Sequence, residues 1–402
     1  MKIALITNMS PAAENIRGTS ALPFHLLVHR PEDVDVDIYT FNFNDLPQEK
    51  IEESARQLRT RIKVLPYSPW LRRIIRSPLG MPVRLMLRYP IHNYLTMRAD
   101  DAEAIVRAGY DAILIYGEEM GRVSRQFARH RRAHILPDCT SLFYHRMLSR
   151  RFVFSHTPTL LKCMLFYKKY VDMERQFDTT GNISYHLVGE VDAEALRNIL
   201  PDIQARFLRH PHYDVAAGTS SDRSTDIAKR RVRLLVAGQN NYYMAQEADL
   251  MVDALCSRPR LADSYELTFL GRGWEDHAAR LRRQGYTTSH IAFAPDYIEE
   301  ICHHDIQLTP ISIGTGTKGK VLDALANGLM VIGTPYAMEN IAVESGKSCI
   351  TYTSAEELLV WLDRIASDRS LITQIAEAGR RAVLKIHSRT DISKEFFENL
   401  KK

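Results

Sequence analysis

Residues 306–335 constrain the fold more than any other part of the chain. A short apolar run from Ile306 to Pro310 leads into a Gly/Thr loop at 314–317, and the segment that follows, from Lys318, stops at Asn327-Gly328. Gly after the last periodic residue is a helix-ending signal, and short apolar runs between turns are typical of buried strands. The pattern therefore predicts strand, glycine-rich loop, helix and strand, which is the repeating unit of a parallel α/β sheet.

The loop and the first helical turn have a composition that suits a phosphate. Gly314 and Gly316 permit positive φ and close approach of a ligand, and a helix N-terminus offers unpaired N–H groups. Lys318 and Lys320 oppose the helix dipole in this first turn, which is easiest to explain by a bound polyanion. Asp323 lies one turn later and can face the same side, where it could accept hydrogen bonds from a ribose diol. The alternative is an ordinary α/β connection whose glycines only form a turn.

This segment resembles the donor-site signature of the GT-B glycosyltransferases of the group-one, or family-four, kind. The pattern in this chain is G-x-G-x-K-x-K-V-L-D-A-L-A-x-G-x-x-V-I-x-T-P, and the resemblance is dense over residues 231–383. It implies two Rossmann-like domains that face each other across a cleft, with Lys320 at the donor diphosphate and Asp323, usually Glu in the family, at the ribose. A second family Glu falls at Thr315 here, so the resemblance implies nucleotide-sugar binding more firmly than a retaining mechanism.

Other loops are expected to complete the donor site. Gln239 and Arg272 each follow an expected strand, where they could bond a sugar or a diphosphate, although both also fit ordinary loops. Residues 339–341 resemble the family's E-G-I turn, whose amides hold the diphosphate and whose Glu touches the sugar. The expected donor-binding residues are Gly314, Thr315, Gly316, Thr317, Lys318, Lys320, Asp323, Glu339, Asn340, Ile341, Gln239 and Arg272.

In the N-terminal half, the apolar run Lys2 to Thr7 is an expected strand, and its following loop carries Asn8 and Gly18. Both are expected to face the cleft, although Gly18 could simply start a helix. Asp138 follows another expected strand, where α/β proteins keep their catalytic groups, and it is the candidate general base. The alternative is that Asp138 caps the next helix, with Ser141 as a rival cap.

Residues 56–98 are basic and apolar at once, with ten Lys or Arg and no Asp or Glu. Residues 1–208 carry a net charge of +6 and residues 209–402 a net charge of −1. Basic residues mixed with large apolar ones suit an anionic membrane surface. A solvated basic face over core residues is the main alternative, and contact with nucleic acid is disfavoured because no recognised module accompanies the stretch. The expected membrane or acceptor patch comprises Arg72, Arg73, Arg76, Arg84 and Arg88.

The length of 402 residues suggests two domains. Residues 1–208 are the expected acceptor-binding domain, together with a C-terminal helix, 388–402, that crosses back to it. A linker rich in Ser, Thr, Asp and Gly is expected at 209–230, and a nucleotide-sugar domain at 231–387. Five cysteines without CxxC spacing, no signal peptide and no apolar run of a membrane span predict a cytoplasmic protein at the inner face of the membrane.

Together these features predict a metal-independent glycosyltransferase that moves a sugar from a UDP- or GDP-linked donor to a saccharide acceptor. The acceptor is expected to be lipid-linked, and the setting to be cell-surface polysaccharide or glycoconjugate synthesis. The nucleotide sugar is a substrate and no cofactor is expected. Asp35 and Asp37 lie within an alternating strand, and the His303-His304-Asp305 run lacks a spaced third ligand set, so neither predicts a metal site. Two alternatives remain, a sugar-nucleotide epimerase of the same fold and a non-catalytic sugar-nucleotide-binding subunit.

Overall fold

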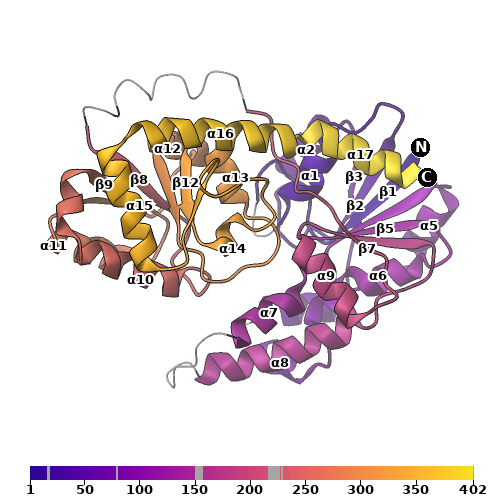
Figure 1. The fold of residues 1–402 in the computed structure, drawn as a ribbon. Helices are drawn as coiled ribbons and strands as arrows, with labels where there is room; N and C mark the ends of the chain where they lie inside the picture. The colour runs from indigo at the N-terminus through magenta and orange to yellow at the C-terminus, as the bar shows by residue number, and fades with distance from the viewer. Residues whose placement is uncertain (16–18, 78–79, 150–156, 216–226, 228–229, 402) are drawn as a thin grey trace. The chain divides into compact units, whose positions relative to one another are not determined.

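The computed structural model describes residues 1–15, 19–77, 80–149, 157–215, 227 and 230–401. The chain forms two compact units, one of Met1–Pro211 with Arg389–Lys402 and one of His212–Ser388. Each unit has one parallel β-sheet flanked by helices (Figure 1). The units therefore divide at 211/212 and at 388/389, beside the sequence-based boundaries at 208 and 388.

Seven parallel strands form the sheet of the first unit, in the order β3-β2-β1-β4-β5-β6-β7. The central strand, β1, has the buried apolar run that predicted it, and Ile3 lies opposite Val36 on one side and Ala112 on the other. The strands are β1 (Lys2–Thr7), β2 (Asp35–Thr40), β3 (Ile62–Val64), β4 (Ala112–Tyr116), β5 (Arg132–Leu136), β6 (Ile183–Leu187) and β7 (Ala205–Phe207). The helices are α1 (Ala21–Val28), α2 (Gln48–Gln57), α3 (Pro69–Arg76), α4 (Gly80–Met86), α5 (Ala99–Arg107), α6 (Gly121–Gln126), α7 (Thr140–Leu148), α8 (Thr157–Glu174), α9 (Glu190–Ile199) and α17 (Arg389–Lys401).

The C-terminal helix α17 packs on the sheet of the first unit, as predicted. Phe396 and Phe397 of this helix join a buried cluster with Ile3 and Leu5 of β1. The hydroxyl of Ser393 also donates a hydrogen bond of 2.7 Å to a carbonyl oxygen of α1. The opposite face of the sheet is covered by other helices, with α5 and α6 over its centre and α8 and α9 over β5 to β7.

Six parallel strands form the sheet of the second unit, in the order β10-β9-β8-β11-β12-β13. The strands are β8 (Val232–Ala237), β9 (Tyr265–Leu270), β10 (Thr287–Ile291), β11 (Ile306–Thr309), β12 (Met330–Gly333) and β13 (Ile350–Thr351). The helices are α10 (Ala245–Cys256), α11 (Glu275–Arg283), α12 (Tyr297–Cys302), α13 (Gly319–Ala326), α14 (Pro335–Met338), α15 (Ala355–Ser367) and α16 (Ser370–Ile386). The strand order reverses between β8 and β11, as it does between β1 and β4 in the first unit. In open parallel sheets, ligands bind at the carboxyl ends of strands beside such a reversal.

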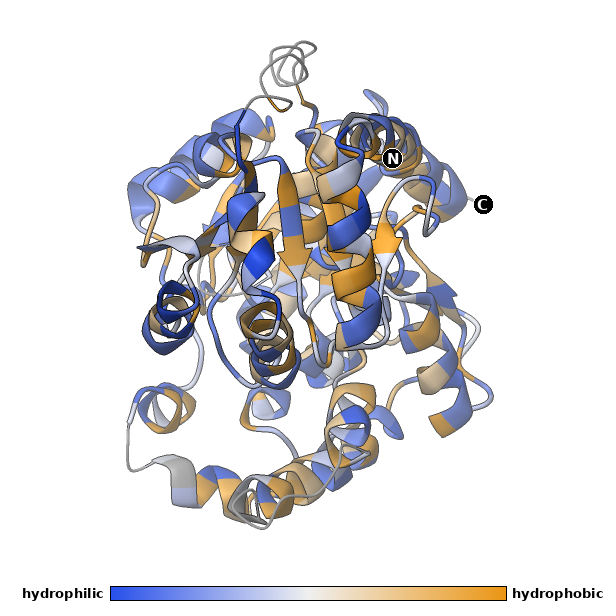
Figure 2. Cartoon of the chain, turned by 60° about the vertical axis from the view of Figure 1, so that its left-hand side comes forward, coloured by the Kyte–Doolittle hydropathy of each residue, from blue (hydrophilic) through white to orange (hydrophobic). Residues whose placement is uncertain are grey.

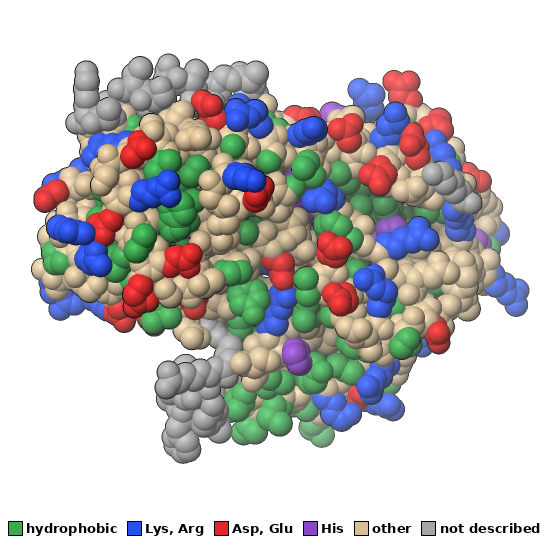
Figure 3. Space-filling model, viewed as in Figure 1, with side chains coloured by type: hydrophobic (Ala, Val, Ile, Leu, Met, Phe, Trp, Pro, Cys, Tyr) green, Lys and Arg blue, Asp and Glu red, His purple; other side chains and the backbone are tan. Residues whose placement is uncertain are grey.

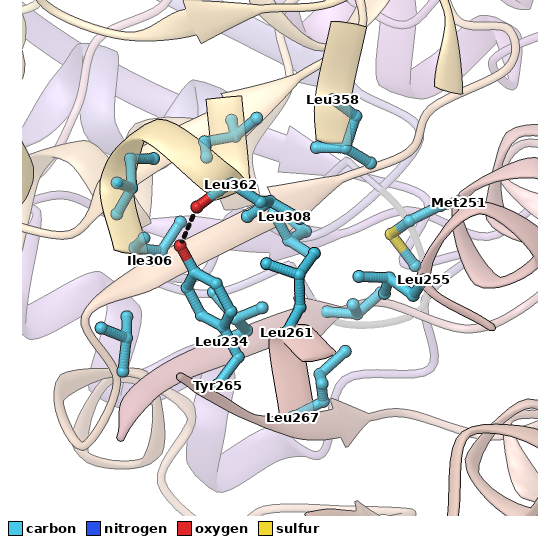
Figure 4. Packing of buried hydrophobic residues seen from close by; sticks show 14 of the residues in the cluster. Leu234, Met251, Leu255, Leu261, Tyr265, Leu267, Ile306, Leu308, Leu358 and Leu362 are labelled. Atoms are coloured by element: carbon cyan, nitrogen blue, oxygen red, sulfur yellow. Dashed lines mark hydrogen bonds between the residues drawn. The ribbon is translucent and has the colours of Figure 1, made fainter. Parts of the chain in front are cut away.

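Apolar residues fill the space between the second sheet and its helices. Figure 2 shows apolar strands at the centre and polar outward faces on the surrounding helices. Leu234 and Leu308 of neighbouring strands pack against α10 and α15, and the buried hydroxyl of Tyr265 donates a 2.6 Å hydrogen bond to the carbonyl oxygen of Leu362 (Figure 4). This core fixes the strand ends, and therefore the loops that follow them.

Candidate functional site

The glycine-rich loop joins β11 to α13 and turns back on itself. Gly316 has a φ of 60°, a value that glycine adopts without strain. A side chain at Gly314 would collide with Lys318, because an added Cβ would lie 2.4 Å from its Cε. The Lys318 ammonium donates to the carbonyl oxygens of Thr315 and Gly316, each at 2.9 Å. Lys318 therefore stabilises the shape of the loop, while Thr317 lies partly buried before it.

Lys320 has a different environment in the first turn of α13. Its Nζ lies 4.0 Å from the centre of the Tyr297 ring, a cation–π distance. Partial shielding from water lowers the pKa of Lys320, and Asp323 opposes this shift. Lys318, the N-cap residue, does not cap the helix with its side chain. The first turn of α13 thus combines helical N–H groups with a cation, which is an anion-binding arrangement.

Asp323 is held by residues that the sequence did not predict. Its Oδ1 lies 3.2 Å from Nε2 of His212, whose Nδ1 lies 3.0 Å from the carbonyl oxygen of Tyr213. The Tyr213 hydroxyl accepts a 2.7 Å hydrogen bond from the amide of Asn327 at the end of α13. Burial and the Asp323 carboxylate raise the pKa of Tyr213. Residues 210–214 are recognisable in the sequence as a loose match to the family's P-N-G-V-D turn, but that signal does not identify Asp323 as the partner.

The loops after β8 and β9 bring Gln239 and Arg272 to the same edge of the sheet. An added Cβ on Gly271 would lie 2.1 Å from the carbonyl oxygen of Gly238, so the two loops approach each other closely. The amide of Asn240 also donates to the carbonyl oxygen of Arg272 at 2.9 Å. Both Gln239 and Arg272 are exposed, and Gln239 follows β8, the strand beside β11, which leads into the glycine-rich loop.

The turn at 339–341 is joined to the glycine-rich loop by Asn340. This residue has a φ of 67°, in the region that the family's Gly would adopt, and its amide donates to the carbonyl oxygen of Gly316 at 2.9 Å. Glu339 is partly buried beside it, and Ile341 is buried in the core. The second unit therefore brings all the expected donor-binding residues to the carboxyl edge of one sheet.

In the first unit, Asn8 lies at the carboxyl end of β1. It lies against Gly117, which follows β4 with a φ of 116°, and an added Cβ there would be 2.8 Å from the Asn8 amide group. Oδ1 of Asn8 is buried and accepts no hydrogen bond from the described residues. Asn8 thus lies beside the strand reversal of this sheet. Gly18 lies outside the described residues.

Asp138 follows β5, in the loop before α7, and is partly exposed. Its carboxylate contributes, after burial, to a raised pKa of the Tyr116 hydroxyl at the end of β4. The candidate base therefore lies at the carboxyl edge of the sheet.

The start of α7 is stabilised by carboxylates from other elements. Glu118 accepts from the amide of Thr140 at 2.9 Å, and Glu174 accepts from the amide of Ser141 at 3.2 Å. Asp192 accepts in the same way from the amide of Cys139 at 2.9 Å. Burial and the nearby Glu174 raise the pKa of Glu118, and burial raises that of Glu174. These acids are far from α7 in the sequence, so no local signal connects them to it.

The expected basic patch separates into two groups. Arg72 and Arg73 on α3 and Arg88 after α4 are exposed. Arg76 instead forms an ion pair with Asp45, and Arg84 donates to the carbonyl oxygens of residues 74 and 75 in α3. The latter two arginines therefore stabilise the local structure of the first unit.

Two further observations concern metals and membranes. Within the described ranges, no group of three or more His, Cys, Asp or Glu is arranged to hold a metal ion. His304 lies 3.0 Å from the carbonyl oxygen of Glu300, and the buried Asp305 accepts two hydrogen bonds from Arg230, so this run is occupied by structural contacts. A search of the described helices finds none long and apolar enough to cross a membrane.

Comparisons with known proteins agree with this geometry. Residues 248–398 match the model of the family described as glycosyl transferase-like. Among solved structures, HepE of Anabaena in complex with UDP has a TM-score of 0.65 at 14% identity, with full coverage of both chains. Sucrose-phosphate synthase of Thermosynechococcus elongatus has a TM-score of 0.62 at 14% identity, over 100% of this chain and 98% of that one. A comparison with curated proteins gives no match.

The low identities show a shared fold, and the family match adds a sequence relationship over the part of the chain that contains the glycine-rich loop. Residues 248–398 therefore resemble the glycosyl transferase-like family, and the chain as a whole has the GT-B fold that its sequence predicted.

Proposed function

We propose that the protein transfers a sugar from a nucleotide-diphospho-sugar to a saccharide acceptor. The observation that carries this proposal is the anion-binding arrangement of the glycine-rich loop, the first turn of α13 and Lys320. A diphosphate leaving group develops negative charge in the transition state, and fixed cations and helical N–H groups stabilise such charge. The solved HepE structure contains UDP, which makes a uracil nucleotide the first candidate donor.

The donor site is tested by nucleotide binding. Thermal unfolding is measured with UDP, GDP, CMP and their common sugars, for the natural protein and for Lys320→Ala. A ligand at a hundred times its dissociation constant stabilises the folded state by about 2.7 kcal/mol, which is readily detected. We expect stabilisation by one nucleotide and its loss in Lys320→Ala. Lys347→Ala is the matched control, because Lys347 is an exposed lysine of the same unit, paired with Glu344. Absence of stabilisation by every nucleotide would contradict the proposal.

Asp138 is the proposed general base of an inverting reaction. Its carboxylate would take the proton of an acceptor hydroxyl as that oxygen bonds to the anomeric carbon and the bond from this carbon to the diphosphate breaks. Asp138→Asn should keep nucleotide binding and lose sugar transfer. If transfer persists in this variant, Asp138 is not the base. Nucleotide binding without transfer by the natural protein to any saccharide acceptor would favour the non-catalytic alternative, which Thr315 keeps open, and conversion of the donor alone would favour an epimerase.

We further propose that the acceptor is lipid-linked and is reached at an anionic membrane surface. The supporting observation is a group of exposed apolar side chains on α3, α4 and α8, here called the α3–α4–α8 surface. Its members are Trp70 at 51%, Met86 at 85%, Leu161 at 61% and Met164 at 53% exposure. Figure 3 shows hydrophobic side chains gathered over α7 and α8 on this face. Large exposed apolar groups in a soluble domain mark interaction surfaces.

The two parts of this surface are joined by a buried lysine. Lys169 of α8 donates to the carbonyl oxygens of Arg84 and Leu85 at 2.8 and 2.9 Å, and also to that of Leu87. Burial lowers the pKa of Lys169. This contact links α8 to the end of α4. Exposed Arg72 and Arg73 supply positive charge beside it.

The membrane proposal is tested by co-sedimentation with vesicles of neutral or anionic phospholipid. We expect binding to anionic vesicles, and its loss when Arg72 and Arg73 are both changed to Glu. The matched control changes Arg282 and Arg283, two adjacent exposed arginines of α11, to Glu. Equal binding by the two double variants would contradict a membrane role for this surface. Failure of the natural protein to bind anionic vesicles would also contradict it.

A further inference from the structure

A polar cavity lies in the first unit, away from the strand ends that carry Asn8 and Asp138. It has a volume of about 240 Å³ and lies between the sheet and the last turns of α17. Its walls come from the starts of β5, β6 and β7, so it lies at the amino edge of the sheet, opposite the carboxyl edge. Pockets for drug-sized ligands are larger, and this volume suits a small ion or metabolite.

The cavity is positively charged. Arg131 and Arg206 both line it and are exposed, and none of the lining residues is acidic. The side chain of Arg206 makes no hydrogen bond or ion pair with any residue in the described part of the chain. Arg131 makes one long contact, 3.4 Å, to the carbonyl oxygen of Lys401. Two guanidinium groups are thus available to a ligand, each able to form paired hydrogen bonds to an oxyanion.

A third arginine is occupied elsewhere. Arg132 also lines the cavity, but its fully buried side chain forms a 2.6 Å ion pair with Asp178 and donates to the Asn182 side chain. Its charge is therefore already balanced. The positive charge available to a ligand comes from Arg131 and Arg206 alone.

The floor of the cavity is polar and partly buried. Ser184 and His186 point to this face of β6, where the Ser184 hydroxyl lies 2.9 Å from Nε2 of His186. The His186 ring packs edge-on against Phe396 of α17. Burial, and then the charge of Arg206, lower the pKa of His186 to about 4. The imidazole is neutral at pH 7 and can donate a hydrogen bond without adding a charge.

We propose that this cavity binds a small phosphate-bearing anion. The two guanidinium groups would hold the phosphate oxygens, and Ser184, His186, Gln204 and Asn399 would supply hydrogen bonds around them. A bound ligand would connect α17 to the starts of β5 to β7, and would therefore stabilise the C-terminal helix on the first unit. This site is separate from the proposed donor site, which belongs to the second unit.

Binding is tested with two probes, inorganic phosphate and a hexose 6-phosphate, by calorimetric titration. The Lys320→Ala background is used to reduce phosphate binding at the glycine-rich loop. We expect one saturable site, weakened about tenfold or more when Arg131 and Arg206 are both changed to Gln. Gln204→Glu is a second variant that adds an opposing charge without removing an arginine, and it should weaken binding as well. Arg107→Gln is the control, because Arg107 is exposed on the first unit and paired with Glu103.

Two local signals identify the site independently of affinity. Phosphate should raise the pKa of His186, measured by NMR titration of its ring, because an anion stabilises the imidazolium. It should also slow amide hydrogen exchange in α17. Tighter binding of the hexose phosphate than of phosphate would identify a phosphorylated metabolite, and equal binding would identify free phosphate. No saturable binding, or equal weakening in Arg107→Gln, would overturn the proposal.

Discussion

The contact between His212 and Asp323 predicts a measurable coupling free energy between these two side chains in the stability of the second unit. The His212 side chain is 4% exposed and that of Asp323 22% exposed, and their atoms are 3.2 Å apart. Both ring nitrogens of His212 lie within hydrogen-bond distance of oxygen atoms, one of the Tyr213 carbonyl and one of the Asp323 carboxylate. A hydrogen bond to a charged group contributes about 1.5–3 kcal/mol, and partial exposure of Asp323 reduces this to about 1–2 kcal/mol.

The assay is a double-mutant cycle of Asp323→Asn and His212→Asn in urea unfolding. Tryptophan fluorescence follows the second unit when Trp70 of the first unit is changed to Phe, because the two remaining tryptophans, Trp274 and Trp361, both belong to the second unit. Each single change should lower the unfolding midpoint by about 0.5–1 M urea, and the double change by less than the sum.

A matched pair in the same unit provides the control for this cycle. His277 and Asp249 lie 2.8 Å apart, but Asp249 is 58% exposed. The coupling free energy of this pair should therefore be smaller than that of His212 and Asp323, below about 1 kcal/mol. The predicted coupling is refuted if the changes in unfolding free energy at His212 and Asp323 add within about 0.5 kcal/mol. It is also refuted if the exposed pair of His277 and Asp249 has an equally large coupling free energy.

Three further predictions concern the stability of each unit. Tyr265→Phe should lower the free energy of unfolding by about 1–3 kcal/mol, measured in urea, because the buried hydrogen bond from the Tyr265 hydroxyl to the Leu362 carbonyl is lost. The raised pKa of Glu118 means that the folded state holds a proton that the unfolded chain releases near pH 4.5. The free energy of unfolding should therefore fall as the pH rises from there toward neutral. Glu118→Gln should reduce this fall between pH 5 and pH 8. Gly379→Ala should destabilise the second unit by about 1–3 kcal/mol in thermal unfolding, because the added Cβ would lie 2.5 Å from a backbone carbonyl oxygen of a packed loop.

The sequence predicted the strand–loop–helix–strand unit well because its signals are local. The predicted strand from Ile306 and the helix from Lys318 to Asn327 correspond to β11 and to α13, Gly319–Ala326. Gly328 ends that helix with a φ of 77°, which is the conformation that its position predicted. Each of these features depends on residues that are neighbours along the chain, so a single sequence contains the information.

The contacts of the candidate site could not be predicted in the same way. His212 lies 111 residues before Asp323, and the acids at the start of α7 come from three other elements. Such pairs depend on how helices pack on a sheet, and many partners would satisfy the same chemistry. The sequence therefore indicated that Asp323 could accept hydrogen bonds, but could not show that a histidine already donates to it.

The basic stretch at 56–98 shows how composition can overestimate a surface charge. Its ten basic residues have no acid among them, yet Lys63 and Arg76 pair with Asp101 and Asp45 from outside the stretch, and Arg84 is bonded to backbone carbonyls. Each basic residue near an anionic membrane contributes about 1 kcal/mol, so these three contacts reduce the attraction that the count implies. Exposed apolar side chains on the α3–α4–α8 surface must then supply a substantial part of any affinity. Membrane binding by this protein should accordingly lose less with added salt than a purely electrostatic association would.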